Sequence, residues 1–281
     1  MPITRFFVAF LVASLLSLGA TAQTLIKRNI AYGNDEEQRF DVYAPDQARH
    51  APVILLVHGG GWRWGDKDAR RVLENKLSHW LPRGFAIVTV NYRLLPKARP
   101  LEQAQDLARA LAAAQGMAAS WGGDRQKFIL MGHSAGAHLV ALLAARPALA
   151  AAEGARPWLG SVLLDSAALN VPSLMASRHL PLFDRAFGSD PTYWQATSPY
   201  HQLSQRSAPI LAVCSTQRTE ACPQAREFVA RAESFGTRAA LLGQDLGHRE
   251  INELLGTESQ YTTAVDAFLR GLDVGVAQAL K

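Results

Sequence analysis

Apolar and polar residues along the chain alternate between patterns typical of strands and patterns typical of amphipathic helices. Continuous apolar runs, such as the one over residues 53–57, are typical of strands buried on both faces of a sheet. We expect strands over residues 25–32, 38–43, 52–58, 85–92, 127–131, 159–164, 209–213 and 237–242. We expect helices over residues 101–121, 135–145, 223–235 and 258–272, with a frayed helical tail over 274–281. The alternation predicts an antiparallel hairpin followed by a mostly parallel sheet with helices on both faces.

One connection is too long to fit this alternation. Residues 165–208 separate two expected strands and carry prolines at positions 172, 181, 191 and 199. Connections of this length in compact domains are usually lids or binding insertions. The apolar residues of this segment include Leu180, Leu182 and Phe183. They predict a small cap of short helices lying over a pocket.

Composition excludes several classes of protein. Of the 281 residues 48% are hydrophobic, which rules out a disordered chain, and two cysteines are too few for a disulfide-built miniprotein. The 29 Lys and Arg against 24 Asp and Glu give a net charge of only +5. The basic residues form no long run and are not interleaved with aromatic residues, so the sequence favours no nucleic-acid partner.

The first residues are typical of a secretory signal peptide. Arg5 precedes an apolar run over residues 6–18, and Ala20 and Ala22 are the small residues that a signal peptidase site requires. We therefore expect a signal peptide over residues 1–22, a single domain over 23–281, and export to the periplasm or beyond the cell. The run is short for a bilayer span, so we expect no integral membrane segment after cleavage. An uncleaved anchor is the alternative.

Export changes the interpretation of the two cysteines. Cys214 and Cys222 are eight positions apart in a chain that is expected to enter an oxidising compartment. A disulfide between them is the favoured interpretation, and two free buried thiols are the alternative.

The strongest chemical signal is a Gly-x-Ser-x-Gly motif over residues 132–136. It follows the apolar strand 128–131 and opens the helix that we expect from residue 135. Glycines on both sides of a serine allow a tight turn that lifts the hydroxyl above the sheet at the positive end of a helix. Ser134 is therefore our candidate nucleophile. A glycine turn with an idle serine is the structural alternative.

A second motif, His58-Gly-Gly-Gly-Trp62, follows the strand that ends near residue 57. Glycines without side chains expose backbone N–H groups, so Gly60 and Gly61 are candidates for an oxyanion hole together with the N–H of Ala135. A phosphate-cradling loop is the alternative, although no Lys-Ser/Thr pair follows. We expect Trp62 and His133 to contribute to substrate binding, and Trp64 either to line the pocket or to pack the loop.

These motifs together resemble the α/β-hydrolase superfamily, over the whole length that follows the expected signal peptide. The triple-glycine loop, the run from Gly132 to Leu139 and the Asn-Tyr-Arg-Leu element at residues 91–94 are most similar to three groups. These groups are the carboxylesterases of the hormone-sensitive-lipase branch, those of the feruloyl-esterase-like branch, and the arylformamidases. The resemblance implies an α/β-hydrolase fold and a serine hydrolase activity.

In this superfamily the acid and then the histidine follow the serine along the chain. His248, in the loop after the last strand, is our candidate base. For the acid, most relatives place an aspartate after the strand that ends near residue 213, where this chain has only Glu220. We take Glu220 as the candidate, because a disulfide would fix its loop, and keep Asp165 and Asp245 as alternatives.

The sequence thus predicts a serine esterase acting on small-molecule esters through a covalent acyl-enzyme. No cluster of ligands at metal spacing is present, so we expect no metal or cofactor. An amide hydrolase of the arylformamidase type and a binding module without catalysis are the two rival hypotheses.

Overall fold

The computed structural model describes residues 27–281, and the expected signal peptide lies outside these described residues. Eight strands form one sheet in the order β1-β2-β4-β3-β5-β6-β7-β8. Strands β1 and β2 form an antiparallel pair, β2 is antiparallel to β4, and β3 to β8 are parallel to one another. The expected mostly parallel sheet with an antiparallel hairpin at its edge is therefore confirmed.

Each expected strand is present, with ends shifted by a few residues. The strands are β1 (Lys27–Ala31), β2 (Arg39–Tyr43), β3 (Ala51–Val57), β4 (Ala86–Val90), β5 (Gly123–His133), β6 (Gly160–Leu164), β7 (Ile210–Ser215) and β8 (Ala239–Gln244). The helices before the cap are α1 (Arg70–Trp80), α2 (Pro100–Met117), the 3-10 turn η1 (Ala118–Trp121), α3 (Ala135–Ala145) and α4 (Pro147–Ala152). The remaining helices are α5 (Val171–Ala176), α6 (Pro181–Phe187), α7 (Pro191–Ala196), α8 (Pro199–Gln202), α9 (Ala221–Ser234), α10 (His248–Glu253), α11 (Gln260–Arg270) and α12 (Val274–Ala279).

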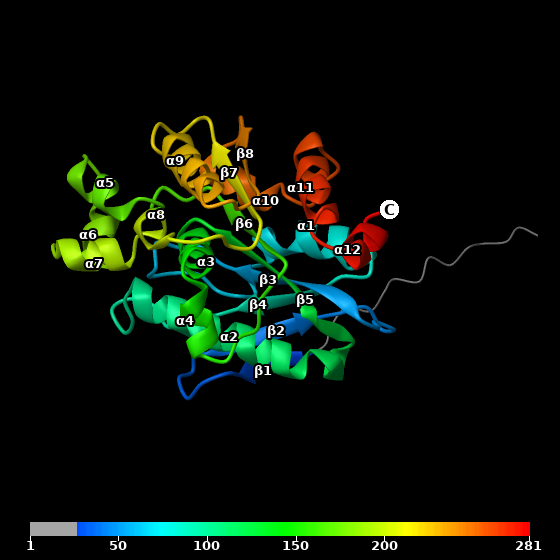
Figure 1. Cartoon of the computed structure of the whole chain (residues 1–281). Helices are drawn as coiled ribbons and strands as arrows, with labels where there is room; N and C mark the ends of the chain where they lie inside the picture. Colours follow the sequence, from blue (N-terminus) through cyan, green and yellow to red (C-terminus); the bar gives the residue numbers. More distant parts are fainter. Residues whose placement is uncertain (1–26) are drawn as a thin grey trace, which may run out of the picture.

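Helices cover both faces of the sheet and create two apolar cores (Figure 1). Helices α2, α3 and α9 contribute to the larger core, whereas α1, α11 and α12 contribute to the smaller one. Every residue of α3 is buried, because this helix lies between the sheet and the neighbouring helices α2, α4 and α8. No helix within residues 27–281 has the length and apolar character that a bilayer crossing requires.

The segment expected to form a cap contains the four short helices α5 to α8, and α5, α6 and α7 project at one end of the molecule (Figure 1). Each of them has proline in its first turn, where a backbone N–H would have no partner within the helix, so the lack of an N–H in proline costs no hydrogen bond. The C-terminal segment differs from the expectation of a frayed tail. Asp273 caps α12, and Val276 and Leu280 are buried against the smaller core.

Candidate active site

The turn between β5 and α3 carries Ser134 in a conformation that few residues other than glycine adopt. Ser134 has φ 55° and ψ −117°, and its N–H donates a 2.8 Å hydrogen bond to the Leu164 carbonyl at the end of β6. A side chain at Gly136 would overlap the Val57 and His58 carbonyls, and one at Gly132 would overlap the backbone of Gly136. Packing therefore requires both glycines of the motif, and together they hold the strained turn.

The hydroxyl of Ser134 lies against the imidazole predicted to act as its base. His248 is the first residue of α10, and its Nε2 is 3.0 Å from Ser134 Oγ. Its side chain is 38% exposed, so one edge of the ring faces the pocket. The expected pairing of Ser134 with His248 is therefore present across 114 positions of sequence.

The other ring nitrogen of His248 contacts Asp165 and not Glu220. Asp165 Oδ2 is 2.6 Å from His248 Nδ1, and the Ser215 N–H donates a 2.8 Å hydrogen bond to Asp165 Oδ1. The carboxylate is fully buried at the carboxyl end of β6. Burial alone would raise the pKa of Asp165, but hydrogen bonds from His248, Ser215 and Arg218 outweigh it and hold the pKa below its ordinary value.

The expected contact between Glu220 and His248 is absent, which corrects our choice of acid. The Glu220 carboxylate is 46% exposed and accepts hydrogen bonds from Arg218 Nη2 at 2.8 Å and Thr219 Oγ1 at 3.0 Å. Arg218 contacts both Glu220 and His248, so its side chain occupies the space next to the ring. The remaining alternative, Asp245, is exposed and accepts a hydrogen bond from Gln217.

Parallel strand register explains why Asp165 reaches the histidine. In the β5–β6 pair His133 lies opposite Leu164, so the residues that follow, Ser134 and Asp165, leave the same edge of the sheet. Asp165 has φ 55° and its N–H bonds the Val213 carbonyl, and this turn directs its side chain toward the loop that carries His248.

The triple-glycine loop lies directly against this turn. A Cβ at Gly59 would come within 3.0 Å of the Ser134 Cβ, and one at Gly60 would overlap the Trp64 carbonyl. Within the described residues, no hydrogen bond engages the N–H of Gly60 or Gly61. Both glycines line the same pocket as Ser134 and Ala135, as an oxyanion hole requires.

The side chains of His58 and Tyr92 stabilise the triple-glycine loop. Their rings stack with centroids 4.5 Å apart, and the Tyr92 hydroxyl donates a 3.0 Å hydrogen bond to the His58 carbonyl. The His58 Nδ1 group bonds the Gly59 carbonyl at 2.8 Å. The backbone that carries the free N–H groups is thereby fixed before any substrate arrives.

The pocket above Ser134 has a volume of about 580 Å³, which is within the usual range for small-molecule sites. Leu182 and Phe183 of α6 and the neighbouring Leu180 contribute its cap side, as the apolar cap sequence predicted. Trp64 is 56% exposed and Leu180 is 63% exposed, and both lie at this pocket. These residues make the cap side of the mouth apolar, whereas the charged residues Glu220 and Arg249 also line the pocket.

Trp62 and His133 line the pocket but bury most of their surface. Trp62 is 2% exposed, donates from Nε1 to His138 Nδ1, and packs edge-on against Phe183 and Phe187. Trp62 therefore joins the cap to α3. Trp64, which is 56% exposed, is the one of the two with surface available to a substrate.

The His133 ring packs against the His248 ring at 4.5 Å, and its Nε2–H donates to the His248 carbonyl at 2.9 Å. Burial, with a smaller contribution from His248, lowers the pKa of His133 to about 3. The ring is therefore neutral at ordinary pH and supports the backbone of residue 248.

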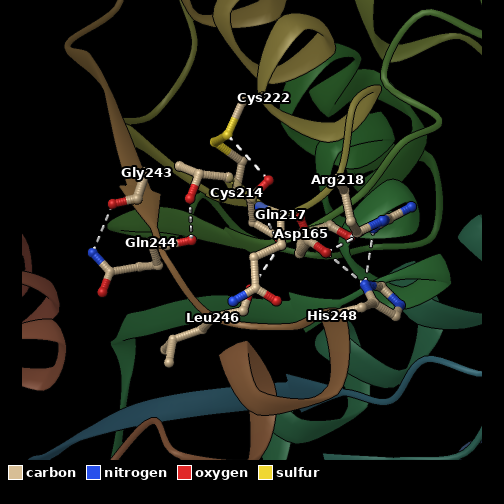
Figure 2. Close-up of a disulfide and its surroundings, with 11 residues drawn as sticks. Asp165, Cys214, Gln217, Arg218, Cys222, Gly243, Gln244, Leu246 and His248 are labelled. Atoms are coloured by element: carbon tan, nitrogen blue, oxygen red, sulfur yellow. Dashed lines mark hydrogen bonds and ion pairs between the residues drawn. A yellow bond between two sulfur atoms is a disulfide. The ribbon is translucent and has the colours of Figure 1, made fainter.

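Sequence reasoning missed Arg218, whose Nη1 is 2.7 Å from Asp165 Oδ2 and 2.9 Å from His248 Nδ1. The only sequence signal was a basic residue two positions from the expected acid. The predicted disulfide between Cys214 and Cys222 is present and closes the loop that carries this arginine (Figure 2).

The sheet topology, the turn at Ser134 and the three aligned side chains define an α/β-hydrolase fold. Within this fold, residues 40–156 match the BD-FAE family model. Esterase LipQ of Mycobacterium tuberculosis is 30% identical over 227 residues, which are 74% of this chain and 53% of that protein.

Two shorter matches cover part of the same region. A probable isoprenylcysteine alpha-carbonyl methylesterase, ICMEL1 of Oryza sativa subsp. japonica, is 33% identical over 41% of this chain and 26% of its own length. The kynurenine formamidase of Salmo salar is 31% identical over 43% of this chain and 39% of its own length. The chain thus spans between about a quarter and a half of the length of these curated relatives.

Solved structures agree on the fold. A truncated carbohydrate esterase from gut microbiota has a TM-score of 0.73 at 17% identity, covering 93% of this chain and 99% of that one. Esterase B from Lactobacillus rhamnosis has a TM-score of 0.70 at 20% identity, covering 90% of this chain and 86% of that one. At these identities the similarity concerns the fold.

Proposed function

We propose that the protein is a serine hydrolase of carboxylic esters, with Ser134 as nucleophile, His248 as general base and Asp165 as the acid that orients it. The observation that carries this proposal is the continuous contact from Ser134 Oγ to His248 Nε2 at 3.0 Å and from His248 Nδ1 to Asp165 at 2.6 Å. The relatives named as esterases and as a methylesterase support the ester as substrate class.

Acylation follows from the positions of these atoms. Ser134 Oγ attacks the ester carbonyl while His248 Nε2 takes its proton, and Asp165 stabilises the imidazolium that forms. The N–H groups of Gly60, Gly61 and Ala135 stabilise the negative charge that develops on the carbonyl oxygen. The tetrahedral intermediate then collapses, His248 returns its proton to the leaving alkoxide, and the alcohol departs.

Deacylation uses the same groups with water as the nucleophile. His248 removes a proton from water, the hydroxide attacks the acyl carbon, and the oxyanion groups again carry the charge. Collapse of this second intermediate breaks the bond to Ser134 Oγ, which regains its proton from His248. The acid is released and the starting state is restored.

The pocket supports a small to medium ester with an uncharged acyl group. Leu180, Leu182, Phe183 and Trp64 give the cap side and mouth an apolar character. Burial of apolar substrate area against these side chains contributes about 25 cal/mol for each Å².

An aryl-formamide is the second candidate substrate, because one relative is a kynurenine formamidase. The same serine, base and oxyanion hole can cleave an amide if His248 protonates the departing nitrogen. Comparing kcat/KM for p-nitrophenyl acetate with that for an N-formyl arylamine separates the two candidates.

Export is part of the proposal. The sequence of residues 1–22 supports a cleaved signal peptide, and the disulfide fits an oxidising compartment. Mass spectrometry of the protein expressed in a bacterial host tests this: an N-terminus at Gln23 in the periplasm or medium supports export, and an intact Met1 in the cytosol contradicts it.

The test of the chemistry is a panel of p-nitrophenyl esters from acetate to octanoate. We expect hydrolysis by the purified protein, loss of activity in Ser134→Ala, and a phosphonate adduct on Ser134 detected by mass spectrometry. A folded protein that neither hydrolyses these esters nor reacts with the phosphonate would contradict the proposal.

A further inference from the structure

One charged residue at the site has no role in the steps above. Arg218 lies in the loop after β7, its side chain is 22% exposed, and it lines the pocket. Its Nη1 group is within hydrogen-bonding distance of Asp165 Oδ2, the Asp165 carbonyl and His248 Nδ1, at 2.7, 3.3 and 2.9 Å. Its Nη2 group bonds Glu220 Oε1 at 2.8 Å. Figure 2 shows its guanidinium directed at Asp165 and His248.

Asp165 and Arg218 both contact His248 Nδ1, and which of them bonds this nitrogen depends on whether it carries a proton. A guanidinium donates hydrogen bonds only, so Arg218 can bond His248 Nδ1 only when that nitrogen carries no proton. In that tautomer Nε2 carries the proton and cannot accept one from Ser134. When Nδ1 carries the proton and its N–H donates a hydrogen bond to Asp165, the guanidinium bonds the carboxylate and Nε2 is free to act as the base. The tautomer of His248 that can act as the base therefore requires the Arg218 guanidinium to bond Asp165 and not His248 Nδ1.

The loop provides this restraint. Its two ends are joined by the Cys214–Cys222 disulfide, and the Ser215 N–H bonds the other oxygen of Asp165 at 2.8 Å. Glu220 holds the outer edge of the guanidinium, away from the ring. The buried carboxylate of Asp165 is thus fixed through both of its oxygens by one closed loop (Figure 2).

Charge gives Glu220 a role in the same arrangement. During acylation His248 becomes positive, and the Arg218 cation next to Nδ1 opposes this change. Asp165 and Arg218 together carry no net charge, whereas the addition of Glu220 makes the group of three negative. Glu220 therefore offsets the arginine at the step in which the imidazolium forms.

We propose that Arg218 is a positioning residue that holds the Asp165 carboxylate in the orientation that accepts the hydrogen bond from His248 Nδ1–H, with Glu220 as its counter-ion. The proposal rests on the proposed function, because it assigns a role to Arg218 within that mechanism. It implies that the loop between the two cysteines aligns the acid that precedes it in the chain.

The test compares Arg218→Ala with wild type on p-nitrophenyl butyrate. We expect kcat to fall by about tenfold to a hundredfold, as is common when a catalytic group is misaligned, while KM stays within about twofold. Guanidinium chloride at low millimolar concentration is expected to restore part of kcat, because the removed side chain opens onto the pocket. Urea at the same concentration should restore none. Arg226→Ala is the matched control, since Arg226 is exposed on α9, and its kcat should be unchanged.

Two further variants keep the test decisive. Arg218→Lys retains the charge without the planar fork, so we expect an intermediate kcat, and it replaces Arg218→Ala if that protein does not fold. Glu220→Gln is expected to lower kcat by less than tenfold. A folded Arg218→Ala or Arg218→Lys protein with wild-type kcat overturns the proposal, as does a loss of kcat that guanidinium does not reverse. Wild-type protein inactive toward all esters would instead contradict the proposed function.

Discussion

At the level of single residues, the proposed acid–base pair depends on one buried aspartate. Asp165→Asn keeps the size of the side chain but can donate to His248 Nδ1 and so favour the unreactive tautomer. We expect kcat for p-nitrophenyl butyrate to fall by about 10⁴-fold with the fold retained. Glu220→Gln is the paired control, with a far smaller loss. Equal losses in both variants would contradict the assignment of Asp165.

The identity of this acid was the part of the site that sequence could not decide. Three parts of the site could be located from short stretches of sequence: the Gly-x-Ser-x-Gly motif, the triple glycine and His248. The nucleophile, the oxyanion hole and the base each need their residues at a fixed place in a strand or loop. The acid has no such motif, since a carboxylate at the end of either β6 or β7 can reach the same histidine. The positive φ of Asp165 and the position of Arg218, which decide between them, are visible only in three dimensions.

At the level of elements, the loop from Cys214 to Cys222 links stability to alignment of the site. Replacing both cysteines with serine is expected to lower the free energy of unfolding by about 2–3 kcal/mol, because the unfolded chain loses a short covalent loop. We also expect kcat to fall with little change in KM, since Ser215 and Arg218 hold Asp165. Urea denaturation and kinetics on the same samples measure both effects. An unchanged kcat would show that the loop holds its shape without the covalent bond.

Helix α6 and the adjacent loops contribute the apolar part of the pocket mouth. Leu180→Ala and Trp64→Ala each remove exposed apolar surface that a long acyl chain can cover. We expect each to lower kcat/KM for octanoate by about fivefold to thirtyfold, from about 1–2 kcal/mol of lost burial. Hydrolysis of the acetate ester is the internal control and should hardly change. Equal losses for both esters would place these residues outside the acyl site.

Sequence patterns located the strands better than the helices on the outer faces. Parallel strands buried on both sides are apolar without interruption and are therefore conspicuous. Helix α1 was missed because its sequence is strongly polar and its buried face includes Lys76. Lys76 Nζ bonds the carbonyls of Val72 and Asn252, and this second contact fastens α1 to the helix that begins with His248. Burial lowers the pKa of this lysine to about 7.

For the whole molecule, buried histidines make stability depend on pH. Burial lowers the pKa of His133 to about 3 and that of His138 to about 4, whereas an unfolded histidine has a pKa near 6.5. The unfolded state therefore takes up protons first as the pH falls below 6.5. We expect each histidine to remove about 2 kcal/mol of unfolding free energy between pH 7 and pH 5.

Urea denaturation at these two values of pH measures this loss. An unfolded carboxyl group has a pKa near 4 and is mostly ionised down to about pH 5, so carboxyl groups contribute little over this interval and the histidines dominate the expected change. An unfolding free energy that does not fall between pH 7 and pH 5 would contradict the neutral, buried state of both rings.

The backbone at Ser134 and Asp165 has a consequence for laboratory evolution. Both residues have positive φ, a conformation that costs roughly 1–3 kcal/mol for a side chain and almost nothing for glycine. Ser134→Gly is therefore expected to raise the melting temperature while abolishing hydrolysis. Selection of variants for heat resistance alone would favour this glycine at position 134 and enrich for stable, inactive proteins. Only a selection that also demands turnover would keep the strained serine on which the proposed chemistry depends.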